Sequence, residues 1–146
     1  MRTIKFRGLT KEGKWIYGMP TFDFQYIFNS EQTDSPDNYE VNPETVTQFT
    51  GLKLKGRELY AKDVIQFRYK DKYEPGGYGY CTGVIEFENG AFVVKEIGFK
   101  YYNWKDNMER PELLYDWLKD NRCKYIGNIY EDPERLFNYK TTKNVF

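Results

Sequence analysis

Apolar and polar residues alternate along much of the chain, and this period of two predicts a protein built mainly of short β-strands. Residues 4–8 and 14–18 both alternate, and the polar run between them predicts that they form a hairpin. Residues 22–28 carry an aromatic side chain at every second position, which also suits a strand. Shorter strands are expected over residues 39–41, 46–50 and 125–130.

The stretch from residue 46 to residue 67 has the order strand, glycine turn, basic loop and strand. The turn is placed at Thr50 and Gly51, and the second strand includes Asp63. We interpret this order as that of a small barrel-like β module. Asp63 itself is interpreted as a turn residue whose carboxylate accepts hydrogen bonds from backbone N–H groups.

The clearest local signal is the pair Asn89 and Gly90, which lies between two β-rich runs. Both residues tolerate a positive φ, so the pair predicts a hairpin with a two-residue type I′ turn. The glycine-rich run before this hairpin, at residues 75–80, is expected to form a flexible loop or a distorted strand edge.

One helix is predicted, over residues 111–120. Pro111 suits the first helical position, and Glu112 complements the helix dipole in the first turn. Apolar residues recur at a spacing that gives one apolar face, and we expect that face to pack on the sheet. These residues are Leu113, Leu114, Trp117 and Leu118.

The composition agrees with one β-rich domain of 146 residues. The 14 tyrosines are interpreted as strand packing or, alternatively, as part of a recognition surface. The net charge is zero, which argues against a general polyanion binder but allows a local basic patch. Residues 51–72 carry seven basic and three acidic residues, whereas residues 31–44 carry five acidic residues and no basic one. Solubility and protection of strand edges explain such charges, and a ligand site is the alternative.

The sequence predicts a cytoplasmic protein. Its first residues alternate in hydropathy and lack the apolar core of a secretion signal, and its apolar runs are too short to cross a bilayer. Cys81 and Cys123 form no CxxC motif, so reduced thiols are the simplest interpretation and a single disulfide is the alternative.

The absence of histidine from the chain excludes Ser-His-Asp and Cys-His catalysis and histidine-ligated metal sites. Glu86 and Glu88 share one face of a predicted strand, where two carboxylates could carry out acid–base chemistry or bind a hard cation. We favour a solvated outer face opposite Ile85 and Phe87, because the alternation of the strand requires one. No catalytic residue, metal site or cofactor is therefore predicted.

Four blocks of sequence together resemble the YopX family, which is known mainly from bacteriophages, prophages and other mobile elements. They are IKFR at 4–7 followed by WIYG at 15–18; QFTGLK at 48–53 continuing through ELY at 58–60 to DVI at 63–65; residues 83–94; and IGNIYE at 126–131 followed by Pro133. The chain departs from the family pattern at Lys62, where the family usually has glycine, and in the short loop after TGLK.

The resemblance implies a mostly β fold, of the β-rich α+β class, with an SH3-like small barrel, an N-terminal β extension and one short helix. We therefore expect a single YopX-like domain over residues 1–146. Its parts are an N-terminal hairpin and strand region (1–50), a barrel-like core (51–132) and a C-terminal turn and tail (133–146). The family brings no established reaction, so the resemblance supplies context and no chemistry.

Two basic segments form the candidate binding surface. The first, on the loop after TGLK, holds Lys53, Lys55 and Arg57. The second interleaves cations with aromatic rings, which suits stacking on bases and pairing with phosphates, or a hot spot for a protein. It consists of Lys70, Lys72, Tyr73, Tyr78 and Tyr80. A solvated basic loop, and tyrosines that pack over the end of their own barrel, are the alternatives.

The sequence thus predicts a non-enzymatic binding or regulatory protein of a phage or mobile element in the bacterial cytoplasm. Its partner would be a protein or a nucleic acid, with no membrane association. A self-assembling structural protein that forms a homo-oligomer is the alternative, and a carboxylate- or metal-dependent enzyme is a third.

Overall fold

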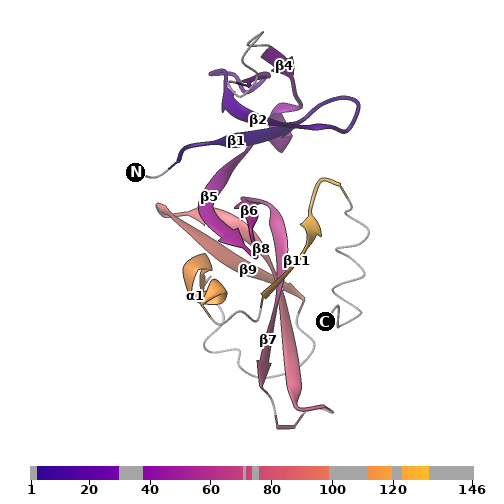
Figure 1. Cartoon of the computed structure of the whole chain (residues 1–146), viewed down its shortest axis with the longest axis vertical. Coiled ribbons are helices and arrows are strands. Elements are labelled where there is room, and N and C mark those ends of the chain that lie inside the picture. Colours follow the sequence, from indigo (N-terminus) through magenta and orange to yellow (C-terminus); the bar gives the residue numbers. More distant parts are fainter. Residues whose placement is uncertain are drawn as a thin grey trace. The chain divides into compact units, whose positions relative to one another are not determined.

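The computed structural model describes residues 3–29, 38–70, 72–73, 76–98, 112–119 and 123–131. These residues are mostly β structure, as predicted, and form two antiparallel sheets (Figure 1). The chain divides between Tyr60 and Ala61 into two compact units, the N-terminal unit and the C-terminal unit. The single domain stays a prediction, because two compact units can belong to one domain, and the tail at 133–146 lies outside the described residues.

The N-terminal unit is a six-stranded sheet with the order β4-β3-β2-β1-β5-β6. Its strands are β1 (Phe6–Leu9), β2 (Trp15–Pro20), β3 (Tyr26–Phe28), β4 (Asn38–Glu40), β5 (Thr47–Leu54) and β6 (Arg57–Tyr60), and a short 3-10 helix, Pro43–Thr45, precedes β5. Three aliphatic side chains, those of Ile16, Ile27 and Val41, form a buried cluster. The predicted hairpin of β1 and β2 is confirmed, and the Thr10 N–H donates to the Lys14 carbonyl at 2.9 Å in its turn.

A buried arginine organises a second cluster in the N-terminal unit. Arg7 is 4% exposed, and its guanidinium lies 4.4 Å from the ring centroid of Trp15 and 4.8 Å from that of Tyr60. Its Nε donates a hydrogen bond to Thr47 Oγ1 at 3.2 Å. Cation–π attraction and this hydrogen bond compensate the guanidinium for the water that it loses on folding. Side chains from β1, β2, β5 and β6 are thereby held together.

The glycine turn predicted at Thr50 and Gly51 is wrong, because β5 runs through both residues to Leu54. The pairing of β5 with β6 shifts its register around Gly51, which takes a φ of 83° in this bulge. The chain turns instead at Lys55 and Gly56, whose φ values of 50° and 84° fit a type I′ turn.

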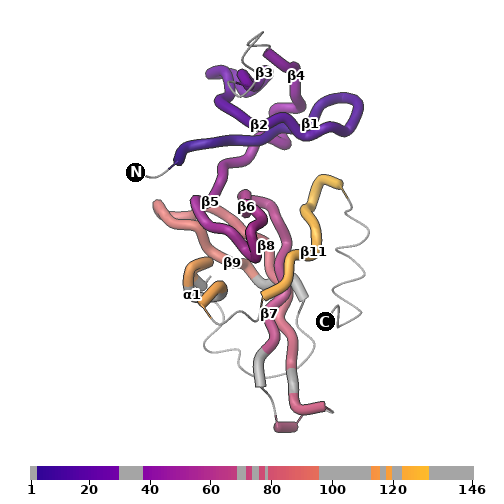
Figure 2. The backbone as a smooth tube through the Cα atoms, viewed as in Figure 1, coloured from indigo at the N-terminus to yellow at the C-terminus, as the bar shows by residue number. Residues whose placement is uncertain are grey.

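The C-terminal unit is a five-stranded sheet with the order β10-β9-β8-β7-β11. Its strands are β7 (Asp63–Lys70), β8 (Tyr78–Glu88), β9 (Ala91–Gly98), β10 (Glu112–Leu113) and β11 (Cys123–Asn128). Strand β7 lies between β8 and β11 (Figure 2), and Val64, Val84 and Ile126 from these three strands form a buried cluster. The hairpin predicted at Asn89 and Gly90 is confirmed, with φ values of 51° and 82° between β8 and β9.

Neither sheet is closed among the described strands. The first sheet has β4 and β6 at its edges, and the second has β10 and β11. The barrel expected from residues 46–67 is therefore not seen as a closed structure. This stretch is shared between two sheets, because β5 and β6 pair in the N-terminal unit whereas β7 pairs in the C-terminal unit.

The helix predicted over residues 111–120 is shorter in the structure. Glu112 and Leu113 pair with β9 as strand β10, and helix α1 contains only Leu114–Leu118. Leu114 is fully buried, but Leu113, which the sequence places on the same apolar face, is 49% exposed. The hydrogen bonds that β9 offers to residues 112 and 113 compete with the start of a helix there.

Lys62 joins three parts of the C-terminal unit. Its N–H donates to the Ile85 carbonyl at 2.7 Å, and its carbonyl accepts from the Ile129 N–H at 3.2 Å. Its Nζ lies 2.5 and 2.6 Å from the two carboxylate oxygens of Glu86. The φ of Lys62 is 72°, a region that glycine enters freely and that strains other residues. This conformation favours glycine, the residue that the resemblance described above leads us to expect at this position.

The variant Lys62→Gly is expected to change the free energy of unfolding by no more than about 1 kcal/mol, because relief of backbone strain offsets loss of the partly exposed ion pair. Lys62→Ala loses the ion pair and keeps the strain, so we expect it to be about 1 kcal/mol less stable than Lys62→Gly. Denaturant unfolding of both variants measures the difference. Equal stability of the two would mean that the backbone at residue 62 is not strained.

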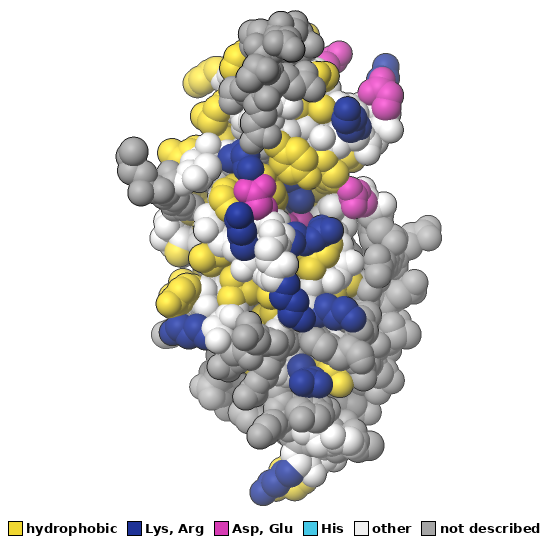
Figure 3. All heavy atoms as spheres, in the orientation of Figure 1, with side chains coloured by type: hydrophobic (Ala, Val, Ile, Leu, Met, Phe, Trp, Pro, Cys, Tyr) yellow, Lys and Arg dark blue, Asp and Glu magenta, His cyan; other side chains and the backbone are white. Residues whose placement is uncertain are grey.

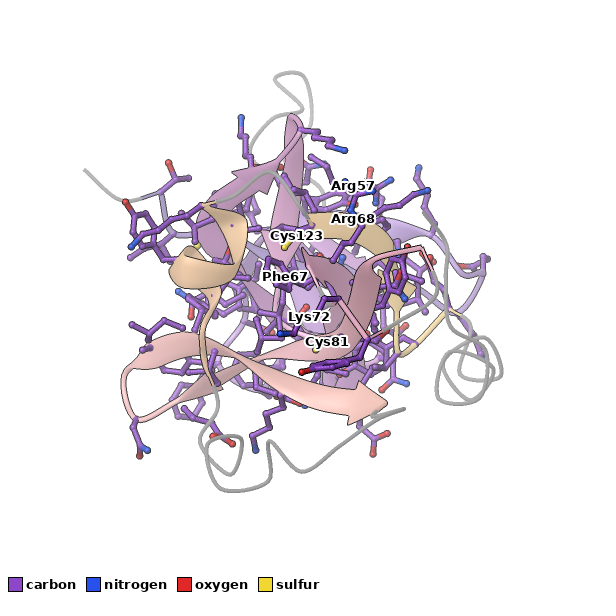
Figure 4. The ribbon with its side chains drawn as sticks, turned by 90° about the horizontal axis from the view of Figure 1, so that it is seen from below. Arg57, Phe67, Arg68, Lys72, Cys81 and Cys123 are labelled. Carbon is purple, nitrogen blue, oxygen red and sulfur yellow. The ribbon has the colours of Figure 1, made fainter. Side chains whose placement is uncertain are left out.

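The two cysteines are buried and lie on the strands that flank β7. Phe67 of β7 pairs with Cys123 of β11 on one side and with Cys81 of β8 on the other (Figure 4). Their α-carbons are thus two strand spacings apart, about 10 Å, whereas a disulfide requires less than about 7 Å. This arrangement fits the interpretation of reduced thiols and does not fit a disulfide between them.

Candidate binding surface

The first predicted basic segment forms the tip of the hairpin between β5 and β6, which we call the basic hairpin. Its side chains Lys53, Lys55 and Arg57 are all exposed. Glu58, which pairs with Lys53 across the hairpin, is held by Lys5, whose Nζ lies 2.8 Å from the carboxylate. Lys5 thus offsets the charge of Glu58, which is the one acidic residue in the sequence from residue 47 to residue 60.

The second predicted segment lies at the turn between β7 and β8. Lys72 and Tyr73 are exposed there, and Lys72 Nζ lies 5.0 Å from the centroid of the Tyr73 ring. Lys70 of β7 pairs with Tyr78 of β8, and two residues further along β8 Tyr80 pairs with Arg68. The side chain of Tyr80 is half-buried. Residues 75–80 were predicted to form a flexible loop or a distorted strand edge, and they are partly strand, since β8 begins at Tyr78.

The predicted site residues do not lie together in one unit. The basic hairpin belongs to the N-terminal unit, and the β7–β8 turn belongs to the C-terminal unit. Each is therefore a separate candidate.

The carboxylate pair on β8 is engaged in ion pairs. Glu86 binds Lys62, and Glu88 binds Lys95, whose pKa is raised chiefly by the hydrogen bond from its ammonium to Glu88. Among the described residues, no three cysteine or carboxylate side chains are grouped as a metal site requires. These contacts support a structural role for Glu86 and Glu88.

Sequence reasoning missed a concentration of exposed apolar side chains among the described residues, which lies on the hairpin between β2 and β3. We call it the aromatic hairpin and define it by five exposed side chains. They are Met19 (49% exposed), Phe22 (104%), Phe24 (45%), Tyr26 (39%) and Phe28 (39%). Hydrophobic side chains at the surface are yellow in Figure 3. The aromatic alternation at 22–28 was expected to form one long strand, but β3 contains only Tyr26–Phe28 and buries Ile27 instead of the rings.

A hydrogen-bonded turn holds the aromatic hairpin in shape. The Thr21 N–H donates to the Tyr26 carbonyl at 2.9 Å, and the Phe24 N–H donates to the Thr21 carbonyl at 2.9 Å. The Asp23 carboxylate accepts from Thr21 Oγ1 at 2.7 Å and from the Gln25 N–H at 3.1 Å. Phe24 takes a φ of 59°, which is rare for a bulky residue. The turn thus presents Phe22 and Phe24 to solvent in a fixed conformation.

The pH dependence of this turn follows from Asp23. The hydrogen bonds from Thr21 and then from the Gln25 N–H lower the pKa of the Asp23 carboxyl below its ordinary value. At pH values above the ordinary pKa, these hydrogen bonds are expected to stabilise the turn fully. As the pH falls through the lowered pKa, the carboxylate is protonated and this stabilisation is expected to be lost. The Gln25 amide shift in an NMR titration measures this change. Asp23→Asn, which keeps an acceptor oxygen but does not titrate, is expected to abolish it.

The charged residues within the aromatic hairpin and on β4, which pairs with β3, are acidic. Asp23 lies in the turn of the hairpin, and Glu40 of β4 pairs with Tyr26 of β3. No lysine or arginine occurs in residues 15–29 or 38–46. The hairpin therefore combines exposed rings with carboxylates.

One signal in the sequence could have identified this surface. Ile16 and Ile27 are β-branched and lie at the positions between the aromatic ones, and both are buried. A strand that buries its aliphatic positions must expose the alternate aromatic ones. The positions of the isoleucines therefore indicate that the opposite face of each strand is the exposed one.

The sequence profile of the YopX protein family matches residues 5–137. This match covers most of the chain, so the protein belongs to the YopX family. Searches of curated proteins and of solved structures found no match. No helix among the described residues is long and apolar enough to span a membrane.

Proposed function

We propose that this YopX-family chain is a non-enzymatic binding protein of a phage or other mobile element, that it acts in the cytoplasm of the bacterial host, and that its partner is a protein held by the aromatic hairpin. The observation that carries the proposal is Phe24, a bulky ring that the turn keeps exposed at a positive φ. Residues held in sparsely populated backbone conformations cluster at functional sites, and Phe24 combines such a conformation with an exposed ring.

The exposed rings support a protein partner. Phe22 is fully exposed, and four further large apolar side chains lie within the same short hairpin. Scattered apolar residues on a surface are ordinary, but a concentration of aromatic ones is typical of protein interfaces. A rigid turn also lowers the entropy that its side chains lose on binding.

The carboxylates make this hairpin a poor site for nucleic acid. Asp23 and Glu40 would repel phosphates, and the segment has no cation to offset them. Nucleic acid is a second candidate on the basic hairpin alone, where Lys53, Lys55 and Arg57 are exposed and Lys5 compensates Glu58. Binding there would weaken steeply with salt.

Purification of the tagged protein from its host, with and without nuclease, tests the proposal. A protein partner is expected to survive nuclease and to be lost from the variant Phe22→Ser/Phe24→Asn. This variant preserves the turn, because Asn adopts a positive φ more readily than Phe does.

Tyr115→Ser, which removes an exposed ring (61%) from helix α1 of the C-terminal unit, is the matched control and is expected to retain the partner. Equal loss in both variants, or retention by Phe22→Ser/Phe24→Asn, would contradict the proposal. Capture of nucleic acid that nuclease removes and that Lys53→Gln/Lys55→Asn abolishes would favour the second candidate.

A further inference from the structure

We infer that the partner of the aromatic hairpin is the basic hairpin of a second copy of this chain. The inference rests on the proposed function and names the occupant of that site. It assigns a head-to-tail contact between two different surfaces of the N-terminal unit, each of which is exposed in a single copy.

The two hairpins have complementary chemistry. One presents phenylalanine and tyrosine rings beside Asp23 and Glu40, and the other presents two lysines and an arginine. Cations bind the faces of aromatic rings, and the carboxylates would pair with the same cations. The chain already makes such contacts internally, since Lys5 Nζ lies 5.6 Å from the Phe49 ring centroid and Lys119 Nζ lies 4.9 Å from that of Tyr115.

A symmetric contact between two aromatic hairpins is less favourable. It would bring Asp23 and Glu40 of one copy close to the same carboxylates of the other, and residues 15–29 supply no cation to pair with them. Like charges across an interface oppose association. A head-to-tail contact avoids this repulsion and uses the excess positive charge of the basic hairpin.

Both surfaces are preorganised for such a contact. The type I′ turn at Lys55 and Gly56 fixes the basic hairpin, and the hydrogen bonds of Thr21 and Asp23 fix the aromatic one. In a dimer held by one such contact, one copy still has an unused aromatic hairpin and the other copy still has an unused basic hairpin. Association therefore continues to longer chains unless a ring closes.

Sedimentation of the purified full chain tests the inference directly. The mean mass is expected to rise with concentration from about 1 to about 200 µM, the range of weak interfaces. Phe22→Ser/Phe24→Asn and Lys53→Gln/Lys55→Asn are each expected to weaken association by about tenfold or more. The control Lys11→Gln/Lys14→Gln removes the same charge from exposed lysines of the β1–β2 turn and is expected to associate like the wild type.

Mixing the two defective variants gives the sharpest result. Each lacks one surface and keeps the other, so each alone is expected to stay mainly monomeric at a concentration at which the wild type associates. An equimolar mixture is expected to form a one-to-one dimer that does not extend, because only one intact contact can form. Circular dichroism of each variant verifies that it is folded.

Three results would overturn the inference: a wild type that stays monomeric throughout this range, association that Lys53→Gln/Lys55→Asn leaves unchanged, or a mixture that stays monomeric. The proposed function fails separately. A monomeric wild type that still captures a different protein through Phe22 and Phe24 overturns the second copy as partner and keeps the aromatic hairpin as a binding site.

Discussion

The variant Gly18→Ala is expected to destabilise the N-terminal unit by about 3 kcal/mol or more. Gly18 lies on β2, and a Cβ added there would collide with the carbonyl oxygen of Phe28 and lie 2.9 Å from its carbonyl carbon. These are backbone atoms of the neighbouring strand β3, and they cannot rotate away as the end of a side chain can. Relief of the clash must therefore separate β2 from β3.

Amide hydrogen exchange measures where this loss falls. Exchange is expected to speed up in β1, β2 and β3 of the Gly18→Ala variant. Gly13→Ala is the matched control, because Gly13 also has a positive φ but nothing lies within 4 Å of its added Cβ. It is expected to cost only about 1 kcal/mol of backbone strain. Similar losses in the two variants would show that the contact between β2 and β3 is looser than the structure describes.

The second large effect is expected in the C-terminal unit, for Gly83→Ala. A Cβ added to Gly83 on β8 would collide with Cγ1 of Val94 on β9 and lie 3.1 Å from the Lys95 carbonyl oxygen. Val94 is 1% exposed, so its side chain has little room to move. Overpacking of this kind costs about 2–3 kcal/mol, and thermal or denaturant unfolding measures it.

A double variant separates this clash from other effects. Val94→Ala alone leaves a small cavity and is expected to cost on the order of 2 kcal/mol. In Gly83→Ala/Val94→Ala the new methyl group occupies space that the valine has left, so the loss is expected to fall short of the sum by about 1 kcal/mol or more. Full recovery is not expected, because the added methyl group still lies 3.1 Å from the Lys95 carbonyl oxygen. Strictly additive losses would mean that Val94 does not set the cost of Gly83→Ala.

Local sequence signals predicted the turns only where one conformation was available. Asn89 and Gly90 lie between two strong strands, and both take the positive φ that a type I′ turn requires. Gly51 and Gly56 have nearly the same φ, 83° and 84°, yet the first lies in a bulge and the second in a turn. Pairing with β6 decides between the two, and such pairing is not visible in the local sequence.

The start of the helix and the closure of the barrel differ from the prediction for the same physical reason. Residues 112 and 113 have the composition of a helix start, but β9 offers them strand hydrogen bonds from a distant part of the sequence. The sequence pattern from β5 to β7 is typical of one continuous module, but β5 and β6 pair in one sheet and β7 pairs in the other. Long-range pairing overrides local pattern in both places.

Of the two hairpins discussed as binding surfaces, the sequence predicted the basic hairpin and not the aromatic hairpin. Charge alone marks the basic hairpin, because lysine and arginine remain in water unless they are paired. The aromatic hairpin was missed because phenylalanine is normally taken to be buried, whereas Ile27 occupies the buried position of β3. Its turn depends on the conformation of Phe24, which the sequence pattern contradicts.

The burial of both native thiols has a practical consequence for labelling. Cys81 and Cys123 are the two cysteines of the chain, and neither presents its sulfur to solvent. A single cysteine introduced at Phe22 or at Lys55 would therefore be the one thiol that a fluorophore or spin label reaches in the native state. Reporter groups can thus be attached to either hairpin while the packing around Phe67 stays intact.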